Sequence, residues 1–320
     1  MLPSVLLPSA TDHVPVLAEE VRELLAVEPG QTVVDATFGA GGHAALLAAE
    51  LDGRGRFVAI DRDPTVRPFF QGFQRRHGGL QSRFLRGDFA TVLGQLAGNG
   101  VKADAILLDL GVSSMQIDRP ERGFSYAADA PLDMRMDPTA PLSARELVNE
   151  AEERELETIF RRYGEERYAR QIARAIGRRR RERPFERTGD LVETIKAAIP
   201  APARFGEGHP AKRVFQGLRI AVNDELEALA AALPSALEML RPRGRLAVIS
   251  FHSLEDRIVK RFLRDGERGC VCPPDFPICV CGQEPVLRAI NRRAIRPGAR
   301  EVALNPRASS ARLRAAVKQP

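Results

Sequence analysis

The first 110 residues alternate short apolar segments with helical sequence, and this alternation limits the fold more than any other feature. Four strand-like segments cover residues 31–38, 55–61, 83–88 and 103–109, and three of them are rich in Val, Ile, Ala or Leu. Short apolar strands that alternate with helices indicate a parallel sheet covered by helices on both faces. The sequence therefore predicts an α/β fold.

This alternation stops between about residues 143 and 200, where only helical patterns occur. The stretch Ser143-Ala-Arg-Glu146 fits a capping box at a helix start, and apolar residues then recur at four-residue spacing. Sheet-like sequence returns afterwards, and the expected elements are a long helix over about 210–240, a strand over 244–250, a helix over 254–263 and a closing strand over 311–317. We expect a core of residues 1–125 and 210–320, with an inserted all-helical domain over residues 126–209.

The charge balance favours an acidic partner. The chain has 48 Lys and Arg against 42 Asp and Glu, which gives a net charge of +6 and a pI near 9.5. Nearly all of the basic residues are arginines, which suit phosphates and base stacking, although genome composition produces the same bias. Nucleic acid is the first partner to expect. The sequence has no 18-residue apolar run and no secretory signal pattern, so we expect a cytoplasmic protein without a membrane span.

A glycine-rich turn, Asp35-Ala-Thr-Phe-Gly-Ala-Gly-Gly-His43, joins the first strand to the next helix. Glycines at 39, 41 and 42 let backbone amides approach a ligand closely, and the helix start favours an electron-rich group. A turn of this kind without a ligand is the alternative. Asp61 ends the second strand, 22 residues after Gly39, where a carboxylate can bind both ribose hydroxyls of an adenosine cofactor.

The glycine spacing distinguishes two adenosine cofactors. The G-x-G-G pattern differs from the G-x-G-x-x-G fingerprint of dinucleotide sites. Helical sequence also replaces the second half of a dinucleotide fold, and no diphosphate cradle is evident. S-adenosylmethionine, which lacks a diphosphate, therefore fits better than NAD.

Two further residues follow strands at the same expected edge. Phe89 comes after the third strand, where an aromatic ring can pack on an adenine; a place in the core is the alternative. Asp109 ends the fourth strand, at the carboxyl edge where open α/β sheets place their ligands. We take Asp109 as the candidate catalytic residue, with helix capping or loop fixing as its alternative.

Eight blocks of sequence, in order along the chain, resemble one family. The blocks are Asp35-Ala-Thr-Phe-Gly-Ala-Gly-Gly-His43, Ala59-Ile-Asp-Arg-Asp-Pro64, Leu107-Leu-Asp-Leu-Gly-Val-Ser-Ser114, Arg122-Gly-Phe-Ser-Tyr126, Pro131-Leu-Asp-Met-Arg-Met-Asp137, Tyr163-Gly-Glu-Glu-Arg167, Val214-Phe-Gln216 and Ile249-Ser-Phe-His-Ser-Leu-Glu-Asp-Arg257. Together they resemble the RsmH (MraW) family of bacterial 16S ribosomal RNA cytosine-N4 methyltransferases. The resemblance runs from His13 to about Arg312.

The resemblance implies a class I, Rossmann-like methyltransferase core that uses S-adenosylmethionine, with an inserted helical domain for substrate recognition. It implies methyl transfer to the exocyclic N4 of a cytidine in the decoding region of 16S ribosomal RNA, within the small ribosomal subunit. The implied cofactor-binding residues are Gly41, Gly42, His43, Asp61, Phe89, Asp109 and Gln116. His43 and Gln116 come from the resemblance alone. Met115 stands where the family usually has proline, a departure that would loosen the loop carrying Gln116.

Several alternatives stay open. The amine proton could go to Asp109, a backbone carbonyl, Ser250 or His252. Competing functions are methylation of another acceptor (DNA or a protein amide), an NAD-linked dehydrogenase and non-catalytic RNA binding. The oligomeric state also stays open, with a dimer as one option.

Two clusters of residues suggest further sites. Cys270, Cys272, Cys279 and Cys281 fall within twelve residues, and such clustering in a cytosolic protein favours structural zinc, with reduced thiols or disulfides as alternatives. The basic run over residues 178–183, with Arg170 and Arg174 before it, is the candidate phosphate-binding surface. A solvated helix end is the alternative for this run.

Overall fold

The computed structural model describes residues 15–204, 209–269, 272, 276, 278 and 281–320. The chain divides into two compact units, one formed by residues up to Gly111 together with Ala228–Pro320, the other by Val112–Glu227. The second unit extends beyond residues 126–209 on both sides. One reason is that Val214, Phe215 and Leu218, which follow that range, belong to the second unit's core.

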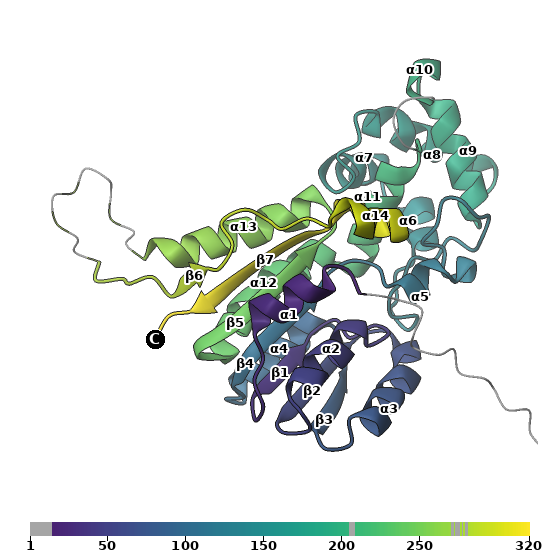
Figure 1. The fold of residues 1–320 in the computed structure, drawn as a ribbon. Coiled ribbons are helices and arrows are strands. Elements are labelled where there is room, and N and C mark those ends of the chain that lie inside the picture. The colour runs from purple at the N-terminus through teal and green to yellow at the C-terminus, as the bar shows by residue number, and fades with distance from the viewer. Residues whose placement is uncertain (1–14, 205–208, 270–271, 273–275, 277, 279–280) are drawn as a thin grey trace, which may run out of the picture. The chain divides into compact units, whose positions relative to one another are not determined.

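The first unit is built on a seven-stranded sheet, drawn in Figure 1. Its strand order is β3-β2-β1-β4-β5-β7-β6, with β7 antiparallel to both of its neighbours and the first five strands parallel. The strands are β1 (Thr32–Asp35), β2 (Arg56–Asp61), β3 (Gln81–Arg86), β4 (Ala103–Asp109), β5 (Leu240–Ser250), β6 (Leu287–Ala289) and β7 (Arg312–Lys318). The chain thus has the Rossmann-like α/β architecture that the sequence predicts.

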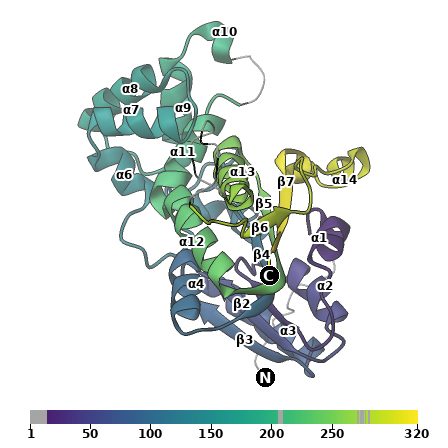
Figure 2. The same ribbon diagram turned by 90° about the vertical axis from the view of Figure 1, so that its left-hand side faces the viewer.

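Helices cover both faces of this sheet (Figure 2). One face carries α1 (Ala18–Leu25), α2 (Gly42–Glu50) and α3 (Arg67–Arg76); the other carries α4 (Phe89–Gly98), α12 (Glu225–Met239) and α13 (Ser253–Arg268). Short elements complete the unit: η1 (Pro64–Val66), α14 (Ala299–Leu304) and η3 (Pro306–Ser310). Because both faces are covered, the central strands are apolar along nearly their whole length, as in the fully buried strand β1.

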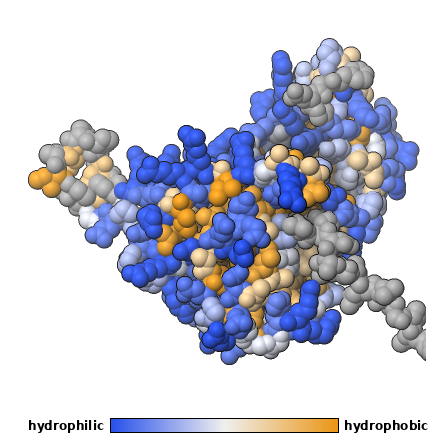
Figure 3. Space-filling view, in the orientation of Figure 1, coloured by the Kyte–Doolittle hydropathy of each residue, from blue (hydrophilic) through white to orange (hydrophobic). Residues whose placement is uncertain are grey.

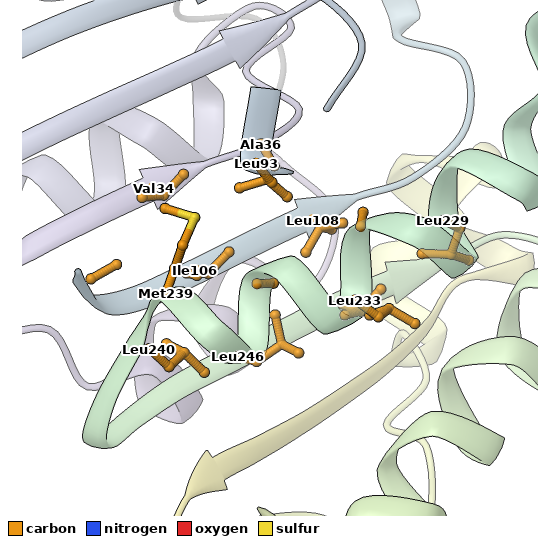
Figure 4. Close-up of a cluster of buried hydrophobic side chains, with 14 of the residues drawn as sticks. Val34, Ala36, Leu93, Ile106, Leu108, Leu229, Leu233, Met239, Leu240 and Leu246 are labelled. Atoms are coloured by element: carbon orange, nitrogen blue, oxygen red, sulfur yellow. The ribbon is translucent and has the colours of Figure 1, made fainter. Parts of the chain in front are cut away.

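A dense apolar core lies between β4 and the helices α4, α12 and α13 on one face of the sheet (Figure 4). Ile106 and Leu108 of β4 pack with Leu233 and Met239 of α12 and with Leu93 of α4, all of them less than 2% exposed. Burial of this kind contributes roughly 1.5–3 kcal/mol for each large side chain. This packing fixes β4, and with it the strand end at Asp109.

The second unit is helical. Its elements are α5 (Ser114–Ile117), η2 (Pro120–Arg122), α6 (Ala144–Glu150), α7 (Glu153–Arg162), α8 (Ala169–Glu182), α9 (Thr188–Ala198), α10 (Ala201–Arg204) and α11 (Lys212–Asn223). The predicted capping box is present, since the Ser143 side chain accepts from the Glu146 amide while the Glu146 side chain accepts from the Ser143 amide. A core of its own, with Phe160, Ile172 and Leu191 fully buried, holds these helices together.

The structure differs from the sequence prediction at two places. The single helix expected over residues 210–240 is two helices, because Asp224 adopts a left-handed conformation (φ 50°, ψ 36°) that ends α11 before α12 begins. The strand β6 was not predicted, since its three residues are too few to show a period.

The surface of the first unit is mainly hydrophilic on the face drawn in Figure 3, with apolar side chains gathered beside β7 and α1. Among the described residues, no helix is both long enough and apolar enough to cross a membrane.

Candidate cofactor-binding and catalytic site

Three carboxylates end three parallel strands of the first unit: Asp35 on β1, Asp61 on β2 and Asp109 on β4. Parallel strands finish at one edge of a sheet, so these side chains share that edge. The strand register also places the three strand ends near one another, because Asp35 pairs with Ala59 of β2 and with Leu107 of β4. Each of these partners lies two residues before the end of its strand. The strand ends predicted for Asp61 and Asp109 are confirmed.

The glycine-rich turn follows β1 and requires glycine at its tightest point. Gly41 has φ +81°, and a Cβ there would lie 2.8 Å from the Phe38 ring. Its amide donates to the Phe38 carbonyl at 2.8 Å, which closes the turn. The helix α2 starts at Gly42 and has His43 in its first turn, so the predicted order of strand, glycine turn and helix is confirmed.

Asp61 is held by the turn in front of it. Its Oδ2 accepts from the Gly39 amide at 2.8 Å and its Oδ1 from the Asp63 amide at 2.9 Å. A carboxylate has about four lone-pair sites, so both oxygens keep room for one more donor. Two adjacent ribose hydroxyls are donors that this arrangement can accept.

His43 and Asp109 lie against each other at the carboxyl edge. His43 Nε2 is 3.6 Å from Asp109 Oδ2, too long for a hydrogen bond. Oδ1 of Asp109 is buried without a hydrogen bond of normal geometry, and so are both ring nitrogens of His43, although the Val16 backbone lies close enough to His43 to favour its charged form. Such atoms are rare in folded proteins and call for a partner, here one that a bound ligand would supply.

Burial dominates the pKa values at this edge. It raises the pKa of Asp109 to about 8, with additional repulsion from Asp35 and Glu255. It also raises the pKa of Asp35 to about 7 and that of Asp61 to about 6, while it lowers the pKa of His43 to about 4. His43 is therefore neutral at pH 7, and a positive charge brought to this edge would favour ionised carboxylates.

The raised pKa of Asp35 predicts a pH-dependent stability. A neutral Asp35 side chain contributes fully below its ordinary pKa of 3.8, and this contribution is lost as the pH rises through about 7. Asp35→Asn cannot ionise, and its side-chain oxygen can still accept from the Thr37 amide. We expect urea unfolding of the cofactor-free variant to match the wild type near pH 4 and to exceed it by about 2–4 kcal/mol at pH 8. An equal difference at both pH values would contradict the burial of an ionisable group here.

The other predicted cofactor residues lie as follows. Phe89 is the first residue of α4 and is partly buried against the core of the first unit. Asp88, just before it, caps α4 by accepting from the amides of Ala90 and Thr91 at 2.9 and 3.1 Å. Gln116 is buried in the second unit, where its Oε1 accepts from the Ser113 amide at 3.1 Å. A cofactor contact by Phe89 or Gln116 stays a prediction.

Three further residues lie beside the site and were not among the predicted site residues. The Thr37 hydroxyl accepts from the Asp109 amide at 2.6 Å and so ties the glycine turn to the end of β4. Asp35 ends its strand as Asp61 and Asp109 do, and the same rule would have found it. Glu255 accepts from the amides of Phe251 and His252 at 2.7 and 3.1 Å in a capping box of α13.

These residues fit S-adenosylmethionine better than a dinucleotide. The edge is lined by carboxylates, which attract a sulfonium and an ammonium group and repel a diphosphate. Arg62, which follows the end of β2, is already 3.5 Å from Asp88. The Asp109 Oδ1, which has no hydrogen bond with a described residue, offers a polar contact to a charged ligand.

The basic run has a mixed role. Arg180 donates to the Val148 and Ala151 carbonyls at 2.9 and 2.7 Å, and Arg179 lies 3.4 Å from Asp190 and over the Phe185 ring. These two arginines stabilise the second unit, which corrects the expectation that the whole run faces a phosphate.

Two of the four cysteines, Cys270 and Cys279, lie outside the described residues, so structural zinc at the cysteine cluster stays a prediction.

Comparisons with known proteins show the family of this chain. The model of the MraW methylase family matches residues 10–319. A "Ribosomal RNA small subunit methyltransferase H" of Heliobacterium modesticaldum is 53% identical over 308 residues, which cover 96% of this chain and 98% of the relative. A protein of the same description from Symbiobacterium thermophilum is 52% identical over 311 residues, 97% of each chain. The chain belongs to the MraW methylase family.

Proposed function

We propose that this chain transfers a methyl group from S-adenosylmethionine to the exocyclic N4 of a cytidine in the decoding region of 16S ribosomal RNA, within the small ribosomal subunit. The observation that carries the proposal is the carboxylate edge formed by Asp35, Asp61 and Asp109 next to the glycine turn. Family membership and the names of the two relatives support ribosomal RNA as the substrate. The N4 position and the decoding region rest on the sequence resemblance.

Each residue of the edge then has a role in binding. Asp61 would hold the ribose hydroxyls, since both of its oxygens are fixed by backbone amides and keep free lone pairs. Gly41 and Gly42 would let the backbone approach the cofactor, and Phe89 would pack against the adenine ring. S-adenosylmethionine, when bound, supplies the electrophilic methyl group.

Asp109 is the proposed acceptor for the amine. An exocyclic amino nitrogen is a poor nucleophile because its lone pair is delocalised into the base. A carboxylate that accepts a hydrogen bond from this amine stabilises the positive charge that develops as the new bond forms. Asp109 suits this role because its backbone is fixed by Thr37 and its Oδ1 has no partner among the described residues.

We assign substrate recognition to the second unit, where one face of α8 is basic. Arg170, Arg174 and Arg178 are exposed and recur every four residues, within about 80° of the helix circumference. Their side chains have no ion pair or hydrogen bond with any described residue. Such a row is complementary to a phosphate backbone, which positions a nucleic acid without reading its sequence.

Two measurements test the proposed function. Calorimetric titration with S-adenosylmethionine, S-adenosylhomocysteine and NAD should show binding of the first two only; binding of NAD alone would favour a dehydrogenase. Incubation of labelled S-adenosylmethionine with small ribosomal subunits and with naked 16S RNA should label RNA in at least one of them. Cofactor binding without any label in RNA would favour a different methyl acceptor.

A further inference from the structure

An arginine-rich segment of the first unit is hydrogen-bonded to β7 at the edge of the sheet. Residues 288–300 contain five arginines and no Asp or Glu. We call its part over residues 290–296 the arginine strap. The strap includes Arg292, Arg293 and Arg296, all three of them exposed.

Backbone and side-chain hydrogen bonds hold the arginine strap in place. The amide of Ile290 donates to the Ala315 carbonyl at 2.8 Å, and Ile295 and Leu313 exchange amide-to-carbonyl bonds of 3.0 and 2.9 Å. The Asn291 side chain accepts from the Ala315 amide at 2.7 Å and donates to the Leu313 carbonyl at 2.9 Å. The strap is therefore an ordered extension of the sheet and holds its arginines at a defined place.

That place is the edge that carries the candidate active site. Leu313 pairs with Ile249 of β5, and Ile249 pairs with Asp109 of β4. Ile295, Leu313, Ile249 and Asp109 thus form one row across four adjacent chain segments. Three inter-strand spacings put Ile295 about 14 Å from Asp109. Arg296 is the next residue, so it is near enough to meet a phosphate a few nucleotides away from a base that is bound at Asp109.

The charge of the strap is not neutralised by the carboxylates along it. Asp256 pairs with Arg312 and Arg314, at 3.2 and 2.7 Å. Glu301 accepts from the Leu17 amide at 2.8 Å and Glu267 from the Ala289 amide at 2.8 Å. By contrast, the side chains of the three strap arginines have no hydrogen bond or ion pair with any described residue.

We infer that the arginine strap binds the phosphate backbone of the substrate RNA beside the target nucleotide and positions that nucleotide at the carboxyl edge. The inference rests on the proposed function, because it takes RNA as the substrate. Arginine suits this role, since its planar fork meets a phosphate with two hydrogen bonds. Contacts of this kind fix the register of the RNA and are independent of its sequence.

The test compares two triple variants of the full chain. Arg292→Gln/Arg293→Gln/Arg296→Gln removes three charges from the strap. The control, Arg56→Gln/Arg75→Gln/Arg243→Gln, removes three charges from exposed arginines at the opposite edge: the first residue of β2, the last turn of α3 and the turn within β5. Equal loss of net charge in both variants separates a local contact from general attraction of RNA.

Steady-state methylation of small ribosomal subunits is measured for both variants at several salt concentrations. We expect the strap variant to raise KM for subunits about tenfold or more, with kcat changed less than threefold, and to reduce the slope of log affinity against log salt by about 2. Its affinity for S-adenosylhomocysteine and its melting temperature should match the wild type, and the control variant should keep the wild-type KM.

Two results would overturn the inference: a wild-type KM and salt slope in the strap variant, or the same increase of KM in the control. Failure of the proposed function looks different. In that case the wild-type chain itself places no methyl group on ribosomal RNA.

Discussion

Asp109→Asn should lower kcat for methyl transfer to small ribosomal subunits by about 10²–10⁴-fold, the range of a positioned proton acceptor. Asparagine keeps the size of the side chain but cannot take the charge or the proton that the amine releases. The backbone bond from the Asp109 amide to Thr37 is unaffected by the change, so the end of β4 should stay in place. Single-turnover methylation with labelled S-adenosylmethionine measures the effect on the chemical step.

A matched control for this variant lies on the same strand. Asp104→Asn removes the same charge from the other end of β4, where Asp104 accepts from the Thr32 amide and pairs with Arg241. This control should retain nearly the wild-type rate. If Asp109→Asn also stays within threefold of the wild type, the acceptor is another group, with Ser250, His252 or a backbone carbonyl as the remaining choices.

The pH dependence of kcat/KM is a second test of Asp109→Asn. The pKa of Asp109 is raised to about 8 in the free chain, and kcat/KM for S-adenosylmethionine reports groups of the free enzyme. We expect kcat/KM to rise with pH up to about 8 in the wild type, because the ionised carboxylate attracts the positive cofactor and accepts the proton. Asp109→Asn should lose this rise.

Asp61→Ala should weaken the binding of S-adenosylmethionine by about 1–3 kcal/mol, or roughly 5–150-fold in Kd. The variant loses the proposed acceptors for two ribose hydroxyls, and it also leaves the amides of Gly39 and Asp63 without their present partner. Asp61→Asn keeps one acceptor oxygen and should fall between the alanine variant and the wild type. Calorimetric titration gives all three affinities, and melting temperatures show whether the turn has unfolded.

An unchanged affinity in Asp61→Ala would mean that the adenosine lies elsewhere. A loss of affinity together with a large fall in melting temperature would instead assign Asp61 to the structure of the glycine turn. The asparagine variant separates these cases, because one amide of the turn keeps a side-chain acceptor.

Much of the sheet was predictable because its strands are buried on both sides. Each of β1, β2 and β4 is a short apolar run that ends in a carboxylate, a pattern that depends on no distant residue. The break between α11 and α12 was not predictable, since it depends on the backbone conformation of one residue, Asp224.

The site was predictable to the extent that topology alone creates it. Parallel strands bring their carboxyl ends together, so Asp61 and Asp109 could be assigned to one edge before the structure was known. The contact between His43 and Asp109 could not be assigned in this way, because helical sequence after a glycine turn does not specify which side chain faces the sheet.

The contacts of the arginines could not be predicted from their neighbours in the sequence. Arg178, Arg179 and Arg180 are consecutive, yet only the Arg178 side chain has no hydrogen bond, ion pair or ring contact with the described residues. Arg180 bonds carbonyls that lie 29 and 32 residues away along the chain, and no helical period can reveal such partners. The arginine strap was overlooked for the same reason, since its place beside the site follows from its pairing with β7.

The central claim is that this carboxylate edge methylates the N4 of a 16S ribosomal cytidine. The most direct measurement incubates the chain with labelled S-adenosylmethionine and small ribosomal subunits that lack the modification, then digests the RNA to nucleosides and identifies the labelled one by mass spectrometry. We expect N4-methylcytidine from a single site in the decoding region, and its loss in Asp109→Asn. Label on another base, on ribosomal protein or on no component of the subunit would contradict it.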